Sequence, residues 1–127
     1  MSKAAVIVAI GIAGLVGCGS HSSSAGTGAL SPEATQGRQL ASQFHCTDCH
    51  SPNGAKRQGP TWKGIWGSTV QLDDGTSAVV DTGYVAESIR QPQEQVVKGF
   101  APIMPTLALT DPQIAAVTAY IRALGTG

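Results

Sequence analysis

The residues best suited to chemistry are two cysteines and a histidine in the segment Cys46-Thr47-Asp48-Cys49-His50, a C-x-x-C-H motif. Two thiols three residues apart can reach the two vinyl groups on one edge of a haem. The adjacent histidine is then placed beneath the ring, where its imidazole can bind iron. The motif therefore predicts one covalently attached haem c.

The C-x-x-C spacing also occurs in two other kinds of site. A redox-active dithiol normally accompanies a thioredoxin-like βαβ pattern, which this sequence does not show. A structural zinc site needs four ligands, and the remaining histidines are poorly placed for it. His21 lies in a Gly/Ser-rich stretch, and His45 directly precedes Cys46. Both alternatives are disfavoured, and His45 is expected to be a partly exposed neighbour of the motif.

A second axial ligand for the iron has few candidates. After removal of Met1, Met104 is the only methionine, and it lies in the segment FAPIMP at residues 100–105. Two prolines stiffen this loop, which can therefore hold a weak thioether–iron bond in place. Met/His ligation raises the reduction potential of a haem and leaves no open position on the iron. The alternative is that Met104 only fills the core, leaving the iron open for ligand binding or peroxide chemistry.

Length and composition restrict the class of protein. The chain has 127 residues, eight basic and eight acidic residues, and a charged fraction of only 13%. The length suits one small domain, and the neutral balance excludes a strongly basic nucleic-acid binder. Two Phe, two Trp and two Tyr make a thin core, which a large buried cofactor would help to fill.

The N-terminal region predicts export and a lipid anchor. Lys3 precedes an uninterrupted run of small and apolar residues from Ala4 to Val16, which is short for a membrane span and typical of a signal peptide. The following Leu-Val-Gly-Cys18 sequence resembles the bacterial lipoprotein signal. The resemblance implies that residues 1–17 are removed and that Cys18 carries acyl chains. An ordinary cleaved signal and an uncleaved anchor are the alternatives.

Three regions follow from this interpretation. Residues 1–17 are the signal peptide, residues 18–31 are the lipidated cysteine and a Gly/Ser/Ala-rich flexible tether, and residues 32–127 form one domain. Haem attachment is completed outside the cytoplasm, so the export signal agrees with the motif. We expect the protein in the cell envelope, anchored to a membrane and facing the periplasm or the outer surface.

The elements that must position the motif are expected to be mostly helical. Ser31 and Asp81 are typical helix caps, and Thr110 with Gln113 forms a capping box. The turn DDG at residues 73–75 lies between two β-like runs and predicts a hairpin. The expected elements are helices over 32–44, 82–90 and from 111 to about 124, a turn of helix over 93–97, strands over 69–72 and 77–80, and an ordered loop over 51–68.

The region from about residue 32 to 127 resembles class I cytochrome c domains, on the strength of the C-x-x-C-H motif and of Met104-Pro105 followed by a terminal helix. It is more specifically similar to the cytochrome c domain of bacterial haem–copper oxidase subunit II and to the small monohaem subunit of alternative complex III. The segments that carry this similarity are Gly59-Pro60, GIWGS at 64–68, DDG at 73–75, Tyr84 with Glu87-Ser88-Ile89, and residues 99–105. No cupredoxin domain accompanies the motif, so we expect the haem domain alone on its own lipid anchor.

The resemblance implies a mostly α, class I cytochrome c fold of about four short helices around one haem, with an inserted β-hairpin. Cys46 and Cys49 would form the thioethers, with His50 as the proximal and Met104 as the distal iron ligand.

Four further residues take roles from the same resemblance. The Pro60 carbonyl would accept the ring N–H of His50 and fix its orientation. Trp66 would lie beside the haem propionates, with plain core packing as the alternative. Gly37 and Tyr120 would meet where the first and last helices cross.

The function implied is a membrane-anchored monohaem electron carrier, and not an enzyme, in a respiratory chain. It would deliver electrons to, or belong to, a terminal oxidase or a quinol-oxidising complex. The alternative is a haem protein with an open iron site. Expected partners are redox proteins and the membrane through its anchor, but no nucleic acid, with the chain a monomer or a subunit of a larger complex. Lys56, Arg57 and Lys63 would give the haem edge a positive face, unless they are only solvated surface charges.

Overall fold

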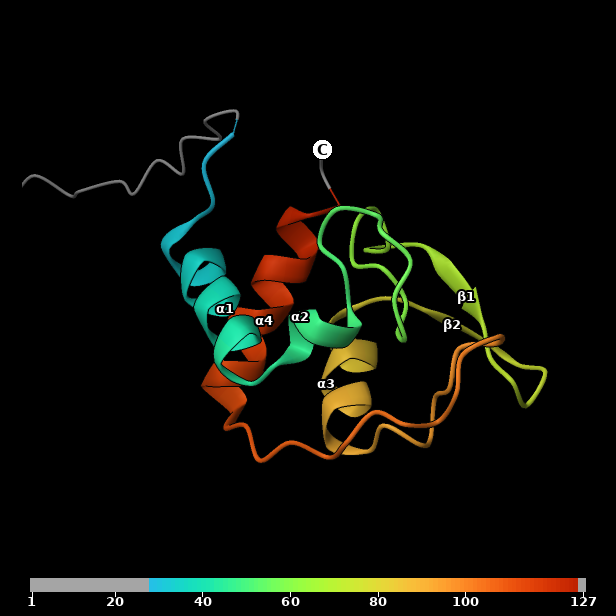
Figure 1. Ribbon diagram of the computed structural model, residues 1–127. Helices are drawn as coiled ribbons and strands as arrows, with labels where there is room; N and C mark the ends of the chain where they lie inside the picture. Colours follow the sequence, from blue (N-terminus) through green and yellow to red (C-terminus); the bar gives the residue numbers. More distant parts are fainter. Residues whose placement is uncertain (1–27, 126–127) are drawn as a thin grey trace, which may run out of the picture.

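The computed structural model describes residues 28–125 (Figure 1). The predicted signal peptide, Cys18 and most of the predicted tether lie outside the described residues. Between residues 28 and 125, no helix is both long enough and apolar enough to cross a membrane.

The predicted mostly helical fold with one hairpin is confirmed. The two strands of the hairpin pair antiparallel, with Val70 opposite Ala78. The elements in chain order are α1 (Pro32–Gln43), α2 (Cys46–Cys49), β1 (Thr69–Gln71), β2 (Ser77–Val79), α3 (Thr82–Arg90) and α4 (Asp111–Ala123).

Local sequence signals determine where the longer helices begin. The Ser31 hydroxyl accepts a hydrogen bond from the backbone N–H of Ala34 at 3.1 Å, and the Asp81 carboxylate accepts one from Tyr84 at 2.9 Å. At α4, the side-chain oxygen of Gln113 accepts the backbone N–H of Thr110 at 2.9 Å. These contacts satisfy N–H groups that a helix start otherwise leaves unpaired.

Helices α1 and α4 cross in close contact, and Gly37 makes this possible. A Cβ atom at residue 37 would lie 1.9 Å from the carbonyl oxygen of Ala116 and 2.9 Å from Cβ of Tyr120. The predicted contact between Gly37 and Tyr120 is therefore present. The crossing buries one face of α1 and most of α4; the buried residues include Ala34, Leu40 and Ala41 of α1 and Ile114, Val117, Tyr120 and Ile121 of α4.

One predicted element was wrong. Residues 93–97 do not form a turn of helix, because the chain makes a local turn over residues 92–94 and then pairs with the hairpin at Val96 and Val97. Val97 forms a β-bridge with Leu72, and the N–H of Asp73 donates to the carbonyl of Val96 at 2.9 Å. The N–H of Lys98 donates to the carbonyl of Gln71 at 2.8 Å. The chain thus pairs briefly with the hairpin over residues 96–98 before it reaches Met104.

The arrangement leaves α2 at the centre of the molecule. Figure 1 shows α1 and α4 paired on one side, α3 and the hairpin on the other, and α2 between them. The segment from about residue 98 to 110 returns below α2 and α3 in this view. The motif on α2 and the methionine loop therefore approach a common interior from different directions.

Candidate functional site

A largely apolar cavity lies between α2, α3, α4 and the segment that contains Met104. It includes about 1180 Å³ of empty space, counting its opening to solvent. Its walls carry Cys46, Cys49, His50 and Met104 together with mainly aliphatic and aromatic side chains. The structure therefore brings the four principal predicted site residues to a single cavity.

The motif is held on a one-turn helix that the sequence did not reveal. His45 turns the chain from α1 into α2 with a φ of 58°, a left-handed conformation uncommon outside glycine. Cys46 and Cys49 are the first and last residues of α2 and lie on the same helix face by their spacing of three. Both are free thiols, and burial raises the pKa of the Cys46 thiol.

The His50 side chain is oriented as the sequence predicted. Its Nδ1 lies 2.8 Å from the carbonyl oxygen of Pro60, which can only accept, so Nδ1 carries the proton. Nε2 is then left with a free lone pair, which is the form that binds a metal. Burial lowers the pKa of His50, and the hydrogen bond to Pro60 opposes that shift more weakly. The imidazole is therefore neutral near pH 7.

Two neighbours fix the position of the imidazole ring. Trp62 stacks on His50 with ring centroids 5.2 Å apart and an angle of 12° between the planes. Trp62 in turn meets Tyr120 edge-on, at a centroid distance of 6.1 Å. Gly59 lies so close that a Cβ atom there would be 2.6 Å from Cε1 of His50. The ring is thus packed against the 59–62 loop, and Trp62 connects it to Tyr120 of α4.

The resemblance implies Trp66 beside the haem, whereas the structure places Trp62 on the cavity wall. Trp66 is absent from the lining and packs at the end of α4, where a Cβ atom on Gly125 would lie 2.9 Å from its Cβ. This position fits the alternative of core packing. Trp62 could have been identified from its position two residues after Pro60, whose carbonyl accepts the hydrogen bond from His50.

Met104 is half-buried and lines the same cavity. Pro102 and Pro105 flank it closely, and its own carbonyl accepts a hydrogen bond from Nε2 of Gln93 at 3.1 Å. Gln93 was not anticipated from the sequence, since nothing local connects it to residue 104. The loop is therefore fastened beside its methionine as well as stiffened by proline.

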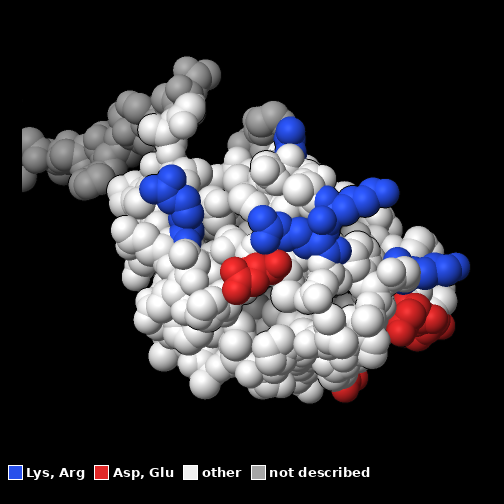
Figure 2. Space-filling model, viewed as in Figure 1, with Lys and Arg blue, Asp and Glu red and all other residues white. Residues whose placement is uncertain are grey.

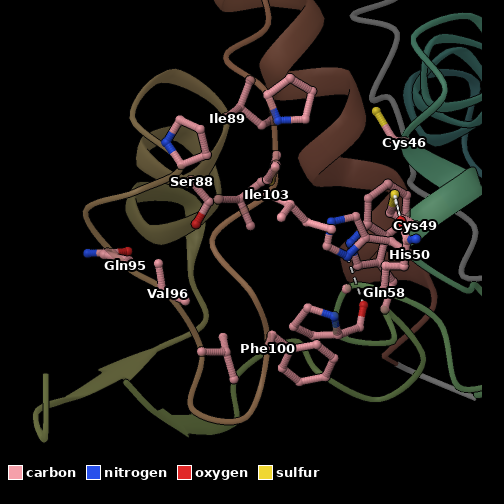
Figure 3. A pocket seen from close by; sticks show the side chains of 18 of the residues that line it. Cys46, Cys49, His50, Gln58, Ser88, Ile89, Gln95, Val96, Phe100 and Ile103 are labelled. Carbon is pink, nitrogen blue, oxygen red and sulfur yellow. Dashed lines mark hydrogen bonds between the residues drawn. The ribbon is translucent and has the colours of Figure 1, made fainter. Parts of the chain in front are cut away.

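The wall formed by α3 and the following turn carries two polar side chains, Ser88 and Gln95, away from the cysteines (Figure 3). Gln95 donates from Nε2 to the Glu87 carboxylate at 3.0 Å. The other end of the same side-chain amide, Oε1 of Gln95, is buried. That oxygen and Oγ of Ser88 complete no hydrogen bond within residues 28–125. The nearby Tyr84 is half-buried, and burial raises the pKa of its phenol.

The chemistry of these groups fits a covalently bound haem. Two free thiols share one helix face, a neutral imidazole presents an unprotonated nitrogen, and a thioether shares a mostly apolar cavity with them. A zinc site finds no such support, because residues 28–125 contain no group of three or more His, Cys, Asp or Glu side chains that could hold a metal ion.

Comparison with known proteins agrees with this geometry. A family model described as cytochrome c matches residues 34–125. Among solved structures, cytochrome cH from Methylobacterium extorquens is similar, with 20% sequence identity and a TM-score of 0.51 over 71% of this chain and 97% of that chain. At this identity the similarity supports the fold alone. A search of curated protein sequences finds no match.

Proposed function

The chain belongs to the cytochrome c family, and we propose that it is a membrane-anchored, His50/Met104-ligated carrier of single electrons. It is a monohaem protein with one covalent haem c on Cys46, Cys49 and His50. The haem supplies an iron that changes by one electron between the ferric and ferrous states. The observation that carries the proposed ligation is that His50 and Met104 line one apolar cavity.

The residues of the chain itself would set the properties of that iron. Pro60 holds the His50 ring through its hydrogen bond, and Trp62 supports it from the core. Gln93 fastens the backbone of Met104. The surrounding apolar side chains exclude water, and with a thioether ligand this raises the reduction potential. A saturated iron disfavours peroxide chemistry, so we propose a carrier and not an enzyme.

The face around the haem motif supports docking of an acidic redox partner. Lys and Arg side chains gather in the middle of the face shown in Figure 2, over the loop that follows α2. Lys56, Arg57 and Lys63 of this loop are exposed. Clustered positive charge raises the rate of encounter with a negatively charged partner even when the net charge is near zero. A terminal oxidase or a quinol-oxidising complex is the partner we propose.

The anchor is proposed from the sequence of the first 18 residues. If Cys18 is acylated, the mature domain would be tethered in the cell envelope with its haem facing the periplasm or the outer surface. Mass spectrometry of the N-terminal peptide tests this. We expect residues 1–17 to be absent and Cys18 to carry acyl chains, and we expect Cys18→Ser to release the protein from membranes. An unmodified Cys18 would contradict the anchor.

Potentiometric titration of the holoprotein tests electron carrying directly. A single haem is expected to give a reversible curve with a one-electron slope, about 59 mV per tenfold change in the ratio of oxidised to reduced protein. The protein should not consume added hydrogen peroxide. An irreversible curve or steady peroxide turnover would favour the open-iron alternative.

A further inference from the structure

The segment over residues 101–109 carries Met104 and is fastened to the rest of the molecule at few points. Three of its side chains pack on the core, those of Met104, Leu107 and Leu109, and its remaining residues are exposed. Among the described residues 28–125, a single hydrogen bond joins this segment to another part of the chain. It runs from Nε2 of Gln93 to the carbonyl oxygen of Met104, at 3.1 Å. The segment is therefore fastened at the residue that carries the proposed sixth ligand.

Gln93 lies on a well-supported part of the chain. It belongs to the turn that directly follows α3, next to Pro92, which is buried and whose ring fixes its φ angle. Arg90 at the end of α3 forms an ion pair with Asp111 at the start of α4, with 2.6 Å between Nη2 and Oδ1. The turn and the end of the methionine segment are thus held to each other, and the N–H donor of Gln93 is offered from a fixed position.

The contact between Gln93 and Met104 lies outside the apolar cavity. Gln93 is exposed and borders a separate surface pocket, whereas the Met104 side chain lines the cavity itself. The acceptor is the backbone carbonyl, so the hydrogen bond leaves the thioether unengaged. Pro105 follows directly and restricts the backbone of Met104 to extended conformations. A group bound in the cavity competes for neither partner of this hydrogen bond.

We propose that Gln93 is a positioning residue that keeps the Met104 thioether on the iron by holding the methionine backbone. The inference rests on the His50/Met104 ligation proposed above. With its carbonyl held, the methionine side chain extends from a fixed Cα, and the sulfur has few other places to go. Without the hydrogen bond the backbone of the segment moves more freely. We expect the sulfur to leave the iron about two- to tenfold faster, the change in rate that one hydrogen bond typically supplies.

Binding of free imidazole to the ferric holoprotein measures this release. Imidazole reaches the iron only after the thioether has left, so at high imidazole concentration the observed rate levels off at the rate of release. In Gln93→Leu we expect this limiting rate to rise about two- to tenfold. The weak sulfur-to-iron band should also disappear at a lower temperature, while circular dichroism shows that the helices are still folded. A merely structural role would change the band and the helices together.

Two matched variants separate hydrogen-bond donation from general disturbance. Gln93→Glu has nearly the same shape, but its carboxylate only accepts hydrogen bonds, so the limiting rate should rise as in Gln93→Leu. Gln91→Leu makes the same change at an exposed glutamine of the same turn, one whose side chain forms no hydrogen bond with residues 101–109. This control should release the thioether at the wild-type rate.

The outcomes distinguish the role of Gln93 from the ligation on which it rests. A wild-type protein that has the sulfur-to-iron band, with Gln93→Leu or Gln93→Glu releasing at the wild-type rate, overturns the role of Gln93 and leaves the ligation standing. A Gln91→Leu rate as high as that of Gln93→Leu also overturns it. A wild-type protein without the band, and without a limiting rate for imidazole, overturns the Met104 ligation and this inference together.

Discussion

Replacing Gly59 with alanine would place a methyl group against the imidazole of His50. An ideal Cβ at residue 59 would lie 2.6 Å from Cε1 and 2.8 Å from Nδ1 of that ring, whereas ordinary contacts begin at 3.4 Å. The ring and the loop must therefore separate by most of an ångström. Two hydrogen bonds oppose that movement: Gly59 N–H to the Cys49 carbonyl at 2.9 Å and His50 Nδ1 to the Pro60 carbonyl at 2.8 Å.

The cost follows from these contacts. Overpacking of a tight site costs about 1–3 kcal/mol, and losing one hydrogen bond adds about 0.5–1.5 kcal/mol. We expect Gly59→Ala to lower the free energy of unfolding of the holoprotein by about 2–4 kcal/mol. The change should also tilt the imidazole and alter the visible spectrum, since His50 is the proposed proximal ligand of the iron.

Unfolding of the ferric holoprotein in guanidinium chloride, followed by circular dichroism, measures this difference. Gly83→Ala is the control, because its Cβ would approach only an exposed carboxylate oxygen of Asp81, at 3.3 Å, within α3. We expect the control to change stability by no more than about 1 kcal/mol, since alanine is the better helix residue. A Gly59→Ala protein within about 0.5 kcal/mol of wild type, with an unchanged spectrum, would refute the argument.

Three further predictions use other parts of the structure. Gly37→Ala places a Cβ 1.9 Å from the Ala116 carbonyl oxygen, so the crossing of α1 and α4 must open. We expect the free energy of unfolding to fall by about 3 kcal/mol and Tm to fall by at least about 12 °C. A fall in Tm of less than about 4 °C would contradict this prediction. Met104→Ala removes the proposed sixth ligand, which should lower the reduction potential and let carbon monoxide bind the ferrous protein; an unchanged potential would argue against ligation. Lys56→Glu combined with Lys63→Glu should slow electron transfer with membrane partners at low ionic strength and converge on wild type as salt screens the charges, whereas equal rates at every salt concentration would exclude electrostatic docking. Arg57 is left in place there because it bonds the motif backbone.

Much of the fold and part of the site could be predicted because their signals are local. Ser31, Asp81 and Thr110 start helices through contacts within the next few residues, and the hairpin depends on its own turn. The C-x-x-C-H motif needs only its spacing. Gly37 and Pro60 were assigned by resemblance, and the structure shows a close helix crossing at the first and a hydrogen bond to His50 at the second.

The remaining features depend on contacts between distant segments. Trp62 and Trp66 are indistinguishable in a loop without periodicity, and between them Gly64 turns the chain with a φ of 70°. Residues 93–97 resembled a helical turn, but residues 96–98 pair with residues 71–73 of the hairpin, a contact that no local signal predicts. Gln93 looks like an ordinary surface residue until the fold brings it to Met104.

The most direct measurement of the central claim is a visible and near-infrared spectrum of the holoprotein, oxidised and reduced, with and without carbon monoxide. An iron held by both His50 and Met104 predicts a c-type spectrum with the weak sulfur-to-iron band at the red end in the ferric state, and no change when carbon monoxide is added to the ferrous state. A c-type spectrum without that band, which shifts on adding carbon monoxide, would contradict the account and indicate an iron open to ligands.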